Sequence, residues 1–172
     1  MKYLWMAFLF LLACSSKTPM PEAPESYGAA ATLLAGKTWT VTRTGTVSPL
    51  GAEGKLTYEW LDEMKEVDDF TKKNLSELAG MQLKFVNDTL ANVTGVPDSP
   101  LEQKYRITID ENVDLSAPFL QFSYEGESLF GGDEKMMMTY SYPIYGINEK
   151  SLVLGTPRSV NNRSVVVMLE VK

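Results

Sequence analysis

The sequence contains no histidine and only one cysteine among its 172 residues. The missing histidine removes the usual general base, the commonest metal ligand and any hydrolase built on a Ser-His-Asp triad. With a single cysteine no intrachain disulfide can form, so packing and hydrogen bonding must hold the fold. No Gly-x-x-x-x-Gly-Lys-Ser/Thr phosphate loop is present. We therefore expect a protein that is not an enzyme and has no metal or cofactor.

Basic residues are also scarce, with 16 Lys and Arg against 22 Asp and Glu and a net charge of -6. Nucleic acid requires a basic surface, so binding to it is not expected. Paired acids could in principle hydrolyse a glycoside or hold Ca²⁺. The acids at 110, 111 and 114 and those at 133 and 134 fall in predicted turns without the spacing of a calcium loop. We interpret them as solvated.

The N-terminus has the pattern of an export signal. Lys2 precedes an apolar run from Tyr3 to Leu12, which is shorter than the roughly 20 residues that span a bilayer. Leu11-Leu12-Ala13-Cys14 then resembles the lipobox of bacterial lipoproteins. That resemblance implies cleavage after residue 13 and acylation of Cys14, with palmitate-type chains that attach the protein to a membrane. The alternative is a plain secretory signal with an incidental cysteine.

The position after the cysteine is Ser15 rather than Asp, which resembles the pattern of lipoproteins sent to the outer membrane. Either the periplasmic or the exposed side of the cell envelope fits. Residues 14–35 contain Pro19, Pro21 and Pro24 and are predicted to be a flexible tether. Residues 1–13 are thus the signal peptide, and residues 36–172 form one domain.

The domain reads mainly as β-strands. Residues 38–47 alternate with period two and place Trp39, Val41, Arg43 and Val47 on one face. The other expected strands are a hairpin over 81–95 with its turn at Asn87-Asp88, then 104–110, 118–126, 135–148 with a bend at Pro143, 151–157 and 163–172. One helix is expected over 57–80, because Trp60, Met64, Val67, Leu75 and Leu78 form one apolar stripe with Thr71.

This order predicts an eight-stranded antiparallel up-and-down β-barrel with one helix after the first strand. An eight-stranded barrel is either filled by side chains or holds one small ligand. Gly36-Lys37-Thr38-Trp39 at the barrel start resembles the Gly-x-Trp region of lipocalins. Over residues 34–172 the chain resembles lipocalin-like lipoproteins of Bacteroidota. The resemblance implies that Trp39 plugs a closed end and that Arg158 or Arg163 packs over it.

One face of each strand should point into the barrel. The expected interior residues are Trp39, Val41, Leu83, Phe85, Tyr105, Ile107, Leu120, Phe122, Tyr124, Met138, Tyr140, Leu152, Leu154, Val165, Val167 and Leu169. Met136, Met138, Tyr140 and Tyr142 share one face, and such adaptable and amphipathic side chains are common in binding pockets. The candidate ligand-binding residues are Trp39, Phe85, Tyr105, Phe122, Tyr124, Met138 and Tyr140.

Two functions remain open at this point. One is a membrane-anchored lipocalin-like protein that binds a small hydrophobic or amphipathic ligand. The other is a non-enzymatic interaction protein, an accessory subunit or inhibitor, with a solid core and functional loops; no protein partner is indicated. A ligand carrier should contain an enclosed void of roughly 300 Å³ or more, lined by apolar and tyrosine side chains, whereas an interaction protein should be packed solid and expose an apolar patch or loop.

Overall fold

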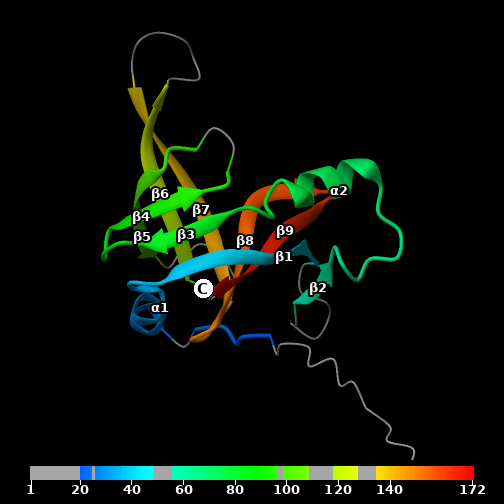
Figure 1. Ribbon diagram of the computed structural model, residues 1–172, viewed down its shortest axis with the longest axis horizontal. Coiled ribbons are helices and arrows are strands. Elements are labelled where there is room, and N and C mark those ends of the chain that lie inside the picture. The colour runs from blue at the N-terminus through cyan, green and yellow to red at the C-terminus, as the bar shows by residue number, and fades with distance from the viewer. Residues whose placement is uncertain (1–19, 25, 49–55, 97–98, 109–117, 128–134) are drawn as a thin grey trace, which may run out of the picture.

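The computed structural model describes residues 20–24, 26–48, 56–96, 99–108, 118–127 and 135–172 (Figure 1). The signal peptide, Cys14 and both acidic clusters lie outside these residues. The described elements, in chain order, are α1 (Tyr27–Leu34), β1 (Thr38–Ser48), β2 (Thr57–Trp60), α2 (Asp69–Ser76), β3 (Gln82–Phe85), β4 (Leu90–Thr94), β5 (Glu102–Thr108), β6 (Phe119–Glu127), β7 (Lys135–Ile147), β8 (Ser151–Val160) and β9 (Arg163–Val171). The strands predicted beyond residue 80 are all confirmed.

Eight of the strands close into an antiparallel barrel. Strands β3 to β9 follow one another as a meander, and β1 joins its two ends by pairing with β3 on one side and β9 on the other. The predicted mainly β, eight-stranded up-and-down barrel is therefore confirmed. The short strand β2 stands outside this circuit, because it pairs with the second half of β1, from Gly45 to Ser48.

A β-bulge divides β1 into two halves that face differently. Val41 is opposite Leu169, and the next register pair joins Arg43 to Met168, so β1 carries one extra residue at Thr42. An extra residue inverts the alternation of side chains beyond it. The prediction that Arg43 and Val47 share a face with Trp39 is therefore wrong. Arg43 instead lies 4.9 Å from the centre of the Trp60 ring.

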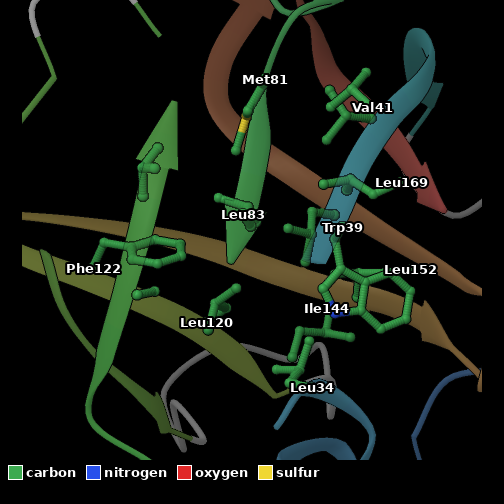
Figure 2. Packing of buried hydrophobic residues seen from close by; sticks show 14 of the residues in the cluster. Leu34, Trp39, Val41, Met81, Leu83, Leu120, Phe122, Ile144, Leu152 and Leu169 are labelled. Atoms are coloured by element: carbon green, nitrogen blue, oxygen red, sulfur yellow. The ribbon is translucent and has the colours of Figure 1, made fainter. Parts of the chain in front are cut away.

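The buried side chains form two clusters on opposite faces of the sheet. The larger cluster fills the barrel and contains Trp39, Leu83, Phe122 and Leu152 (Figure 2). The smaller consists of Val47, Trp60, Val153, Val166 and Met168, with Leu56, Tyr58 and Tyr145 packed against it. Because β8 and β9 contribute to both clusters, they are buried on both faces and read as nearly continuous apolar runs.

The helix predicted over 57–80 is only half correct. Its first part is β2, where Tyr58 and Trp60 stack with ring centres 5.8 Å apart and pack on the smaller cluster. Aromatic residues favour strands, and pairing with β1 outweighs the helical spacing. Helix α2 begins only after Asp68, whose side chain caps it by accepting a hydrogen bond from the backbone N–H of Thr71. Thr71, Leu75 and Leu78 are buried, as the stripe predicts.

The packed structure includes residues that the sequence predicted as tether. Ser26 caps helix α1 by accepting from the N–H of Ala29, and Ala30 and Leu34 are fully buried in the larger cluster. Before the helix, the carbonyl of Glu22 accepts from the N–H of Ile147. The fold thus has a second helix, before the first strand, that the sequence analysis missed.

Replacing Leu34 with alanine should test how strongly α1 is bound to the barrel. Because Leu34 is fully buried, we expect Leu34→Ala to lower the free energy of unfolding by about 2–5 kcal/mol. The measurement is urea denaturation followed by circular dichroism. Leu33→Ala, at a half-buried neighbour on the same helix, should cost clearly less. Equal losses in the two variants would contradict the packing described here.

Candidate functional site

One end of the barrel is closed. Leu34 of α1 packs there with Trp39, Ile144 and Leu152 (Figure 2). Trp39 is 0% exposed, as expected of a residue that plugs the barrel. The cation beside its ring is Lys37, whose Nζ lies 5.6 Å from the ring centre.

The arginine expected over Trp39 is not there. Arg158 forms an ion pair with Glu77, and Arg163 forms one with Glu59. Trp39 is opposite Val171 at the end of β9, whereas Arg163 begins that strand. Eight residues of strand, about 26 Å, separate the two positions, so both arginines belong to the other end of the barrel.

A pocket of about 360 Å³ lies at that other end. Most of its lining is apolar or aromatic, which suits a site for a small organic molecule. The lining residues are Leu78, Met81, Val93, Val96, Ser99, Gln103, Phe122, Tyr124, Tyr140, Tyr142, Thr156, Pro157 and Arg158. Arg158 is the one charged residue in this list.

Aromatic rings of β6 and β7 form one side of the pocket. Phe122 meets Tyr142 edge to face at 5.6 Å, and Tyr124 stacks with Tyr140 at 6.0 Å between ring centres. A hydrogen bond with Tyr140 raises the pKa of Tyr124 to about 12, and burial raises the pKa of Tyr142 despite the opposing effect of Arg158. Tyrosine is already neutral at physiological pH at its ordinary pKa, and these shifts extend the range over which the two phenols can donate hydrogen bonds to higher pH.

Helix α2 borders the pocket and is attached to the hairpin of β8 and β9. At its C-terminal end Arg158 Nη1 lies 3.0 Å from Glu77 Oε2, and Leu78, just beyond the helix, lines the pocket. At its N-terminal end Asn161 Nδ2 donates to Asp68 Oδ2 at 3.3 Å and to Thr71 Oγ1 at 3.1 Å. Hydrogen bonds from Thr71 hold the pKa of Asp68 below its usual range.

A polar group also contributes to the pocket lining from β5. The side chain of Gln103 is buried, and its Nε2 donates to Ser99 Oγ at 2.7 Å and to the Pro100 carbonyl at 3.0 Å. These bonds fix the amide in place. The pocket thus combines an aromatic side with a few fixed polar groups, an arrangement that can orient an amphipathic molecule.

Of the seven candidate ligand-binding residues, Phe122, Tyr124 and Tyr140 line the pocket and the other four do not. Trp39 belongs to the closed end. Phe85 and Tyr105 meet edge to face at 4.9 Å within the core, and the Tyr105 hydroxyl donates to the Asn87 carbonyl at 2.8 Å. Met138 is opposite Tyr124 in the β6–β7 ladder but is not part of the lining. Side chains fill the barrel from its closed end, so only part of the interior is pocket.

Several lining residues were missed as site residues. The sequence pattern places Leu78 on the apolar stripe of a helix, and the resemblance to lipocalins places Arg158 or Arg163 at the closed end. Val93 falls in the predicted hairpin, and Val96 follows it. Of these missed residues, Tyr142 could have been predicted as a site residue, because the sequence pattern places it on the same strand face as Tyr140. The others come together only when the barrel closes and α2 folds back on it.

Among the residues that the structure describes, no three or more His, Cys, Asp or Glu side chains form a group that could hold a metal ion. Neither helix in these ranges is long and apolar enough to cross a membrane. Comparison with protein-family models, curated proteins and solved structures finds no match to this chain.

Proposed function

We propose that this chain is a lipid-anchored protein of the cell envelope that binds one small amphipathic molecule, without catalysis, in the pocket beside α2. The observation that carries the proposal is the pocket itself. Its volume of about 360 Å³ lies within the range of roughly 300–1,000 Å³ that is typical of small-molecule sites. The pocket opens to solvent, so it is not the enclosed void expected of a carrier, but its size and its apolar and tyrosine lining favour a ligand carrier over an interaction protein with a solid core.

The lining supports a ligand with a largely apolar body. Phe122, Tyr124 and Tyr140 offer aromatic surface. Met81, directly before β3, offers a side chain that adapts to irregular shapes. Burial of apolar ligand area would supply most of the affinity, at about 25 cal/mol per Å². Gln103, Arg158 and the tyrosine hydroxyls would orient a polar group.

The place where Glu22 meets the barrel suits attachment through a lipid on Cys14, eight residues earlier in the sequence. The chain enters the domain near Glu22, which bonds to Ile147 at the turn between β7 and β8, next to the closed end. The pocket lies at the opposite end of the barrel. A lipid on Cys14 would therefore hold the closed end toward the bilayer, most simply at the outer membrane, and leave the pocket accessible.

Removing one aromatic ring from the pocket should weaken binding. We expect Tyr140→Ala to lower the affinity for the apolar fluorescent probe N-phenyl-1-naphthylamine about tenfold, since one aromatic contact contributes about 1.4 kcal/mol. The measurement is fluorescence titration of the chain from residue 14 onward, carrying Cys14→Ser so that no acyl group competes.

Tyr145→Ala is the matched control. It makes the same substitution on the same strand, but Tyr145 packs against the smaller cluster on the outer face and does not line the pocket. Its affinity for the probe should stay within about twofold of the unmodified chain. The proposal fails if the folded chain does not bind such probes, or if both variants lose affinity equally.

Replacing Cys14 should release the protein from the membrane. We expect the full chain to fractionate with membranes and to incorporate an alkyne-labelled palmitate. Cys14→Ser should abolish the label, because serine offers no thiol for acylation. Met20→Ser, a change within the same N-terminal region, should leave both unchanged. Labelling that persists in Cys14→Ser would exclude the proposed anchor.

A further inference from the structure

Most of strand β7 has a partner strand on one side only. From Lys135 to Pro143 it pairs with β6, but its pairing with β8 is confined to Ile144–Ile147. No other strand of the described chain pairs with this stretch. The barrel is therefore closed at the level of Ile144 and leaves an open edge along the upper part of β7.

The register shows which backbone groups face this edge. The N–H of Ile144 donates to the carbonyl of Pro118, the residue directly before β6, next to the pair Phe119 and Pro143. Hydrogen bonding in an antiparallel ladder alternates along the strand, so the even-numbered residues of β7 bond to β6. Met137, Thr139 and Ser141 consequently direct both their N–H and their C=O toward the open edge.

Strand β8 lies across the gap. The two strands still touch at Pro143 and Gly155, where a Cβ on Gly155 would lie 2.7 Å from the proline ring. Beyond this point they separate, β7 following β6 and β8 curving toward α2 (Figure 1). The pocket lies in this gap, since Tyr140 and Tyr142 line it from β7 and Thr156 and Arg158 line it from β8.

Two residues of the kind that block strand addition, Lys135 and Pro143, stand at the ends of the edge, and the stretch between them carries neither kind. Residues 136–142, Met-Met-Met-Thr-Tyr-Ser-Tyr, contain no proline and no charged residue, whereas exposed edges are commonly protected by both. Met137 and Thr139 are exposed on the outer side, and Met137 is 55% exposed. Unpaired backbone groups next to an apolar pocket fit the recognition of an extended peptide, in which backbone bonds give affinity and pockets give specificity.

We propose that an extended segment of a partner protein adds to β7 as a strand between β7 and β8, with an apolar side chain in the pocket and an acidic side chain at Arg158. Arg158 donates to Glu77 through Nη1, and a guanidinium has further donors for a second carboxylate. Leu78, just beyond α2, and Thr156 and Arg158 of β8 line the pocket opposite this edge, so a strand that adds to β7 has the pocket beside its inner side chains. This inference uses the pocket but does not depend on its binding a small molecule.

The test begins with selection of a random twelve-residue peptide library on the chain from residue 14 onward with Cys14→Ser. The most enriched peptide is then labelled, and its affinity is measured by fluorescence polarisation. We expect Thr139→Pro to weaken binding at least about tenfold, because it removes an N–H from the open edge and leaves the backbone bonds to β6 intact. Both Thr139→Pro and the control Thr139→Val lose the hydroxyl that bonds to Ser123 Oγ of β6. Thr139→Val keeps the N–H and should stay within about twofold.

A second measurement does not depend on the folding of a variant. The selected peptide, methylated at alternate backbone nitrogens, should lose its affinity for the unmodified chain in one of the two methylation registers. The N-phenyl-1-naphthylamine titration is repeated on Thr139→Pro, where the probe should bind as before because the Thr139 side chain faces outward. For the unmodified chain, probe binding without peptide binding overturns strand addition alone, and peptide binding without probe binding overturns only the small-molecule proposal.

Three results would overturn the inference. They are the absence of any enriched peptide, equal binding of the enriched peptide to the unmodified chain and Thr139→Pro, and a dimer in sedimentation that Thr139→Pro dissociates. The last result would assign the edge to a second copy of the chain.

Discussion

The pairing of the first strand with the last is the constraint on which the rest of the structure depends. It runs from Trp39 opposite Val171 to Val47 opposite Ser164 and joins residues about as far apart in the chain as the domain allows. Through it β9 is buried on both faces, the larger cluster becomes a barrel interior, and α1 can cover the end where Trp39 lies. Such long-range contacts must offset the entropy of closing the intervening chain, which the burial of two apolar clusters makes possible.

The bulge at Thr42 is what lets one strand serve both clusters. Before it, Trp39 and Val41 point into the barrel; after it, Arg43 and Val47 point outward, toward Trp60 and the smaller cluster. The outer cluster in turn accounts for β2, whose aromatic residues cover apolar side chains of β8 and β9 that would otherwise meet water. The two ends of the barrel consequently differ, since apolar packing fills the end at Trp39 while the other end, beside α2, keeps a pocket.

The pocket and the open edge of β7 both arise where β7 and β8 separate. Pairing between β7 and β8 stops at Ile144, just past Pro143, and the strands then diverge, so their inner faces line a cavity while the backbone of β7 loses a partner. Tyr140 and Tyr142 point into that cavity from the strand whose edge is open. The proposed small-molecule binding and the proposed strand addition would therefore use the same gap.

The sequence by itself determined the strand order and three of the pocket residues, Phe122, Tyr124 and Tyr140, because period-two alternation and turn residues are local signals. The closed end at Trp39 was implied only by the resemblance to lipocalins. The prediction for residues 57–60 was wrong, because helical spacing and strand-forming aromatic residues conflicted there. The helix at 27–34 was missed, because small residues and nearby prolines are typical of a tether and because the helix is buried by residues far away in the sequence. Only the tertiary structure decided that Arg158 meets Glu77 at the pocket rather than Trp39 at the closed end. The position of a side chain along a barrel depends on register and on where strands separate, and neither is encoded within a single strand.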